Sequence, residues 1–161
     1  MSNREFYMSR RKRETPAFVR LLKAVPQARL DYRPDPKARS AAQLAWYLAE
    51  EEAALVILLD TGSIEWKDQP VPASVEQIVD AYERSAAAVD ERLAKLAEAD
   101  WEKKVRFVMA GAPPWEDTLG EFLWGFLFDM VHHRGQLSTY LRPMGGKVPA
   151  IYGPTADDLG Q

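Results

Sequence analysis

Four stretches of the chain repeat apolar residues at intervals of three and four positions, which is the pattern of a helix with one buried face. They span about residues 5–24, 40–59, 74–97 and 118–142. Three of them begin at a capping residue, Ser40, Ser74 or Thr118, with glutamine or glutamate three positions later, as in a capping box. Only residues 104–109 have a pattern typical of an extended segment.

The connections set the expected organisation. Thr15 followed by Pro16 is typical of a helix start, so we expect the first stretch to be a short basic helix followed by a second one. Residues 100–117 form an irregular connection that is longer than most bundle loops, and residues 143–161 form a turn-rich tail. The sequence therefore predicts an all-α protein, a single-domain four-helix bundle over residues 1–161.

The last predicted helix carries both histidines of the chain, His132 and His133, close to Asp129. At about 100 degrees per residue, His133 lies about 20 degrees from the apolar stripe centred on Phe126, and Asp129 about 60 degrees to the same side. His132 lies about 120 degrees away and points outward. Because residues four apart share a helix face, Asp129 pairs with His133. The pair is interpreted as metal ligands, as a catalytic couple or as a buried polar contact.

The second predicted helix contains three consecutive acids, Glu50, Glu51 and Glu52. Glu51 and Glu52 flank its leucine stripe on opposite sides, Glu50 points to solvent, and Tyr47 lies on the side of Glu51. A buried carboxylate is costly unless a cation, a hydrogen-bond donor or a metal neutralises it. Glu51 and Tyr47 are therefore candidate partners of the pair on the last helix, and the alternative is a solvated face of acids.

Composition narrows the classes of function. The chain has 161 residues, of which 47% are hydrophobic and 28% charged, and a net charge of -3, values that are ordinary for a globular protein and argue against coating nucleic acid. It has no cysteine, which excludes disulfides and a cysteine nucleophile and fits a reducing compartment. No signal peptide and no apolar run long enough to span a bilayer are visible. We expect a cytoplasmic protein without nucleic-acid or membrane partners.

Two longer segments are similar to a known family. "HHRGQLSTYLRPMGGKVPAIYGP" resembles the last helix and tail of the DinB/YfiT-like family of metalloenzymes, and "LDYRPDPKARSAAQLAWYLAEEE" resembles the entry into its second helix. The resemblance implies an up-down-down-up bundle that is often a homodimer. It also implies a divalent metal, commonly zinc or nickel, bound by three histidines, and in some relatives a low-molecular-weight thiol as cosubstrate.

Laid onto this chain, the three histidine positions of the family fall at Tyr47, Asp129 and His133, so only His133 is kept. Glu51, one turn from Tyr47, would supply a replacement donor. The resemblance thus implies a metal-dependent enzyme with ligands among Tyr47, Glu51, Asp129 and His133, in which a metal-bound thiolate or water acts on a small-molecule substrate. The alternative is a non-catalytic small-molecule binding or structural bundle whose metal site has degenerated. Both hypotheses place these residues around one spot between the second and last helices.

Overall fold

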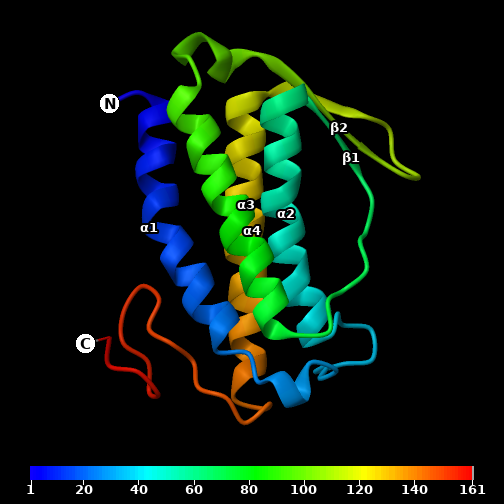
Figure 1. Ribbon diagram of the computed structural model, residues 1–161, viewed down its shortest axis with the longest axis vertical. Helices are drawn as coiled ribbons and strands as arrows, with labels where there is room; N and C mark the ends of the chain where they lie inside the picture. The colour runs from blue at the N-terminus through cyan, green and yellow to red at the C-terminus, as the bar shows by residue number, and fades with distance from the viewer. Residues whose placement is uncertain (161) are drawn as a thin grey trace.

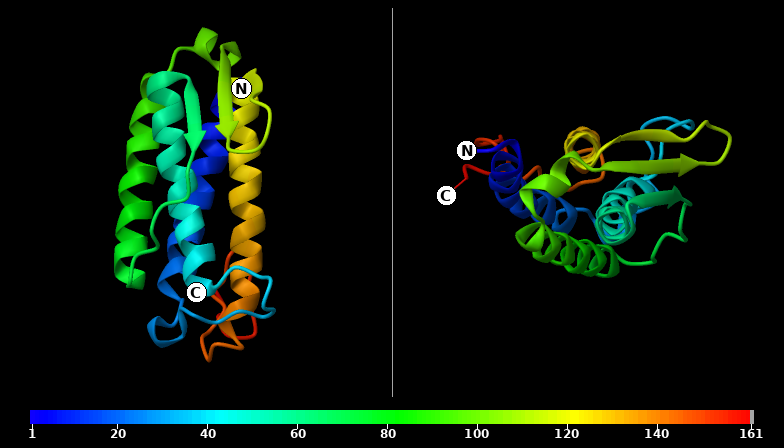
Figure 2. Two further views of the ribbon diagram at one scale, coloured as in Figure 1. Left: turned by 90° about the vertical axis from the view of Figure 1, so that its right-hand side faces the viewer. Right: turned by 90° about the horizontal axis from the view of Figure 1, so that it is seen from above.

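The computed structural model describes residues 1–160, which form four long helices in one bundle (Figure 1). The helices are α1 (Asn3–Lys23), α2 (Ala41–Thr61), α3 (Val75–Lys95) and α4 (Leu119–Leu141). Helices α2 and α3 run in the same direction, and α1 and α4 run in the opposite one (Figures 1 and 2). This is the up-down-down-up arrangement that the family resemblance implied.

The helix starts follow the predicted capping residues. Ser40 forms a full capping box with Gln43, and the side chains of Ser74 and Thr118 each accept a hydrogen bond from the backbone three residues later. The predicted break in the first helix is wrong, because α1 continues through Pro16. The hydroxyl of Thr15 donates to the carbonyl of Arg11 at 3.0 Å, so it bonds back into the helix rather than capping a new one.

The prediction of an all-α protein is wrong in one respect, since the described residues also form a three-stranded sheet. Its strands are β1 (Ser63–Trp66), β2 (Lys104–Met109) and β3 (Trp115–Thr118). Strand β1 pairs with β2 in parallel, and β2 pairs with β3 as a hairpin. The sheet lies beside one end of α2 and α4 (Figure 2). The segment predicted as an irregular connection therefore supplies two of the strands.

A close contact anchors this connection to α4. After the short 3-10 helix η2 (Glu98–Glu102), the indole of Trp101 is buried directly over Gly120. A β-carbon built at Gly120 would lie 2.2 Å from Nε1 of Trp101, so only glycine allows the approach. The backbone N–H of Leu119 donates to the carbonyl of Lys103 at 2.8 Å. These contacts fix where β2 and β3 leave the bundle.

Two buried ion pairs cross the core. Arg11 on α1 forms a bidentate pair with Glu52 on α2, at 2.9 and 2.6 Å, and also bonds Asp90 on α3. On α4, Arg134 donates to Glu14 on α1 at 2.7 Å. The interpretation of the three glutamates as a solvated face is therefore wrong for Glu52, because a buried arginine neutralises it.

The tail folds back beside the lower part of α1 (Figure 1). Its Tyr152 hydroxyl donates to Glu14 at 2.9 Å and also bonds Arg134, which ties the tail to the second buried ion pair. No helix in the described part of the chain is both long and apolar enough to cross a membrane.

Candidate functional site

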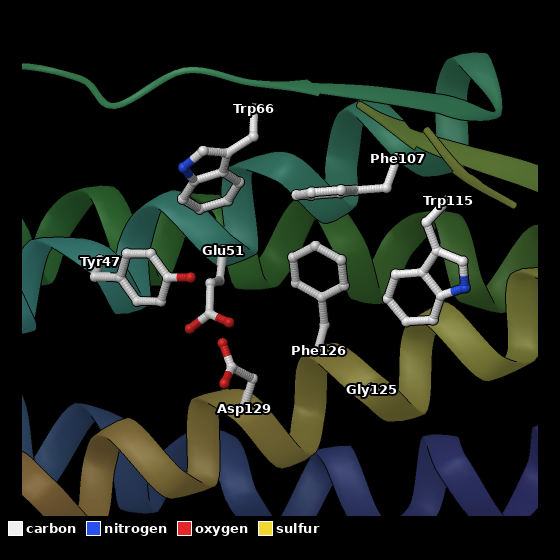
Figure 3. A pocket seen from close by; sticks show the side chains of 8 residues that line it. All are labelled: Tyr47, Glu51, Trp66, Phe107, Trp115, Gly125, Phe126 and Asp129. Atoms are coloured by element: carbon white, nitrogen blue, oxygen red, sulfur yellow. The ribbon is translucent and has the colours of Figure 1, made fainter. Parts of the chain in front are cut away.

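A cavity of about 300 Å³ opens between α2, α4 and the sheet (Figure 3). Helix α2 contributes Tyr47 and Glu51, and helix α4 contributes Gly125, Phe126 and Asp129. The strands supply the aromatic residues Trp66, Phe107 and Trp115. The volume lies at the lower end of the range for small-molecule sites.

Most of the cavity wall is aromatic. The ring of Tyr47 lies 5.3 Å from that of Trp66, Trp66 lies 6.3 Å from Phe107, and Phe107 lies 6.2 Å from Phe126 (centroid distances). One ring thus follows another from α2 across the sheet to α4. Trp115 stands at the far end of the cavity (Figure 3). The pairing of β1 with β2 is what places Trp66 beside Phe107.

The polar groups gather at one side of the cavity, where the carboxyl groups of Glu51 and Asp129 point toward one another (Figure 3). Glu51 is 1% exposed, and no N–H or O–H donor of residues 1–160 reaches its Oε2 atom. Burial, together with the negative charge and the hydrogen bond of Asp129, raises the pKa of Glu51 to about 11. Glu51 is therefore protonated at neutral pH and donates its proton toward Asp129.

Asp129 has its second partner on its own helix, since its Oδ2 lies 3.4 Å from Nε2 of His133. A hydrogen bond from His133 lowers the pKa of Asp129 against the opposing effect of partial burial, so this carboxylate is ionised. Burial disfavours the charged form of His133, but its bonds to Asp129 and Gln136 outweigh this and raise its pKa. A chain of polar contacts then continues outward, with Gln136 bonded to His133 and to His132, each at 2.9 Å.

Tyr47 closes the site from α2. Its ring meets the imidazole of His133 edge to face, with 4.7 Å between centroids, and the guanidinium of Arg39 lies 4.2 Å from its centroid. Burial raises the pKa of Tyr47 above its usual value, and the negative charge of Asp129 adds to the effect. The phenol therefore stays protonated at neutral pH in the metal-free protein.

The structure brings together all four residues predicted for the site. Tyr47, Glu51, Asp129 and His133 converge between α2 and α4, His133 is turned inward with 12% of its side chain exposed, and His132 points out. Their predicted role as metal ligands stays a prediction. As the side chains lie, residues 1–160 contain no group of three histidine, aspartate or glutamate donors arranged around one ion. These residues therefore do not fit a metal ion without rearrangement.

The sequence patterns did not single out the aromatic wall of the cavity, to which Trp66 and Trp115 belong. Trp46 is half-buried between α2 and α3. Trp124 is also half-buried and stacks on the exposed Phe128. The sequence signal for this wall is one aromatic residue in each extended segment, Trp66, Phe107 and Trp115. That signal does not reveal which helices the strands cover.

The fold and the site together define a class of protein. It is an up-down-down-up helix bundle with a ligand-sized cavity between its second and last helices. The DinB family profile matches residues 1–160, and the chain belongs to the DinB family. It is 25% identical over 150 residues to the uncharacterized protein YrdA of Bacillus subtilis (strain 168), covering 90% of this chain and 85% of that protein.

Solved structures agree with this assignment. A DinB-like protein from Bacillus cereus ATCC 10987 has 27% sequence identity and a TM-score of 0.75, over 92% of this chain and 97% of that one. A conserved protein from Enterococcus faecalis has 20% identity and a TM-score of 0.66, over 89% and 97% of the two chains. The mycothiol-dependent maleylpyruvate isomerase, at 15% identity and a TM-score of 0.52, shares the fold over 89% of this chain and 61% of its own.

Proposed function

We propose that this protein is an enzyme that binds a small molecule with an apolar body in the aromatic cavity and transfers protons within it. The observation that carries the proposal is the pair of facing carboxyl groups, Glu51 and Asp129, at the polar side of a cavity whose remaining wall is aromatic. An acid and a base at hydrogen-bonding range in an apolar site are the groups that proton-transfer reactions use.

Each residue has a distinct role in this proposal. Asp129 accepts a proton from one atom of the ligand, and Glu51 donates its proton to another atom of the ligand. The ligand is therefore isomerised without a net gain or loss of protons. The proton then passes from Asp129 back to Glu51, which restores the starting state. His133 holds Asp129 in place at 3.4 Å and stabilises its negative charge, so it is a positioning residue. The aromatic wall gives the reacting atoms an apolar surrounding.

The base can be tested before a natural substrate is known. Opening of a nitrobenzisoxazole ring needs only a base that removes one carbon-bound proton while the N–O bond breaks, and the phenolate product is coloured. We expect Asp129→Asn to lower the catalysed rate at least about a hundredfold, and Glu51→Gln to lower it less. Glu116→Gln is the matched control, because Glu116 is an exposed acid of β3 next to Trp115. A rate that is equal in wild type and Asp129→Asn contradicts the proposal.

Metal-dependent chemistry is the second candidate, and one observation favours it. The unpartnered Oε2 atom of buried Glu51 is an oxygen that a cation would satisfy, and an ionised Glu51 with Asp129 and His133 would make three donors. A bound divalent ion would lower the pKa of a coordinated water or small-molecule thiol. A thiol-dependent reaction, as the name of the maleylpyruvate isomerase states for that protein, belongs to this candidate.

Metal analysis of protein purified without a histidine tag separates the two candidates. The first predicts no stoichiometric zinc or nickel. Stoichiometric metal in the wild type that is lost in both Asp129→Ala and His133→Ala, with the variants still folded, would establish the second candidate in its place.

A further inference from the structure

The rings of the cavity also indicate what kind of ligand it takes. Tyr47, Trp66, Phe107 and Phe126 form a continuous aromatic surface, with neighbouring centroids 5.3 to 6.3 Å apart. The face of an aromatic ring carries partial negative charge and attracts a cation within about 6 Å of its centroid. Several rings around one space are the arrangement that recognises substituted ammonium groups.

The polar side of the same space is acidic. Glu51 and Asp129 are the carboxyl groups that line the cavity, and the lining residues, all within the described part of the chain, include no lysine or arginine. Oε2 of Glu51 is buried with no donor of residues 1–160 in reach, although a buried carboxyl oxygen ordinarily has a hydrogen-bond partner. A positively charged ligand would supply the missing charge or donor, whereas a neutral aromatic ligand would fill the space and leave this atom unsatisfied.

The chain already uses one of these rings to bind a cation. The guanidinium of Arg39, which is not among the lining residues, lies 4.2 Å from the ring centroid of Tyr47. Trp66, Phe107 and Phe126 have no such partner among the cation–ring contacts of the described chain. No cation of the described chain therefore competes with a ligand for these three rings.

We propose that the cavity selects an organic cation, a substituted ammonium group that lies against Trp66, Phe107 and Phe126 with its charge directed at Glu51 and Asp129. The inference rests on the proposed function in one respect only, that this cavity is the ligand site. A space of about 300 Å³ admits such a head group with a short apolar or hydroxylated chain. The negative charge of Asp129 disfavours an anionic ligand.

Three probes of equal shape and different charge test the proposal. They are choline, its neutral carbon isostere with a tert-butyl group in place of the trimethylammonium group, and the anion tert-butylacetate. Binding is measured by calorimetry and by the fluorescence of Trp66 and Trp115. We expect choline to bind at least about tenfold more tightly than the neutral isostere, and the anion to bind least.

Variants then assign the effect to residues. Asp129→Asn and Phe107→Leu should each weaken choline binding about fivefold or more, while the affinity for the neutral isostere changes less than about twofold. Glu116→Gln should change neither. Because Phe107→Leu keeps an apolar side chain of similar length, a circular dichroism spectrum that matches wild type confirms that it is folded.

The inference is overturned if the neutral isostere binds as tightly as choline, or if the anion binds best. It is also overturned if none of the three probes binds. These outcomes concern ligand charge, whereas the nitrobenzisoxazole assay concerns the base, so the proposed function and the ligand class can fail independently of one another.

Discussion

The carboxyl group of Glu51 on α2 faces that of Asp129 on α4 across the polar side of an aromatic cavity (Figure 3). Two buried or half-buried carboxyl groups at this range do not both ionise, so one keeps its proton. Burial decides which of the two groups keeps the proton. Glu51 keeps it, because Glu51 is 1% exposed while 48% of the Asp129 side chain is exposed. The site residues thus have unlike environments, as acid and base pairs in enzymes do.

The proton on Glu51 makes stability depend on pH. Between its ordinary pKa of 4.5 and its folded value of about 11, the folded chain keeps a proton that the unfolded chain releases. Stability therefore falls as pH rises through this window, by at most about 1.4 kcal/mol per pH unit for one proton. Urea denaturation of wild type and Glu51→Gln at about pH 6 and about pH 9 measures this slope. We expect Glu51→Gln to be the more stable protein at the higher pH and to lose much of the slope.

The control for this experiment is Glu116→Gln, which removes an exposed acid and should keep the wild-type slope. Equal slopes in wild type and Glu51→Gln would show that Glu51 is ionised in the folded protein.

The Arg11–Glu52 ion pair gives a second prediction. Both side chains are buried, and Arg11 also bonds Asp90 at 2.6 Å. Arg11→Met leaves the charge of Glu52 buried without a partner, so we expect a loss of about 3–5 kcal/mol in the free energy of unfolding. Adding Glu52→Gln should recover part of the loss, since the uncompensated charge is gone. A double variant as unstable as Arg11→Met in chemical denaturation would contradict this.

The contact of Trp101 with Gly120 gives a third prediction. Because the β-carbon of an alanine would overlap the rigid indole ring, we expect Gly120→Ala to cost about 1–3 kcal/mol and to shift the fluorescence of Trp101. Gly135→Ala on the same helix is the matched control, because nothing lies within 4 Å of its added carbon. Alanine there should stabilise the helix by about 0.5–1 kcal/mol. Thermal unfolding that ranks the two variants the other way would refute the account of how η2 is anchored.

The expected homodimer gives a fourth prediction. Phe6 on α1 and Phe128 on α4 are exposed rings on either side of half-buried Trp124, and Phe128 is 65% exposed. Exposed apolar surface of this kind is typical of an interface, and we predict a dimer in sedimentation analysis. Phe128→Glu should give monomers, while Ile57→Glu, at a comparably exposed position on α2, should not. A wild-type protein that sediments as a monomer would contradict the prediction of a dimer.

The helices could be predicted from sequence because their signals are local. Ser40, Ser74 and Thr118 cap the helices that they were expected to cap, and the angular positions of Asp129 and His133 hold in the structure. Pro16 was a misleading signal, because α1 continues through it and Thr15 bonds back to Arg11 instead of capping a new helix.

The sheet and the aromatic wall could not be predicted in the same way. Strand β1 has only four residues, and its partner β2 begins 38 positions after β1 ends, counted from Trp66 to Lys104. A parallel pairing across that separation leaves no local pattern. The charge state of each glutamate likewise depends on other helices. Glu52 pairs with an arginine of α1, and Glu51 faces a carboxyl group of α4.

The protonation state of Glu51 is the most direct test of the account. Isotope-edited infrared spectroscopy of glutamate-labelled protein distinguishes a protonated carboxyl group from a carboxylate at neutral pH. We predict a protonated carboxyl band that disappears in Glu51→Gln and persists in Glu116→Gln. A spectrum with carboxylate bands alone, unchanged by Glu51→Gln, would contradict the claim that Glu51 holds a proton beside ionised Asp129.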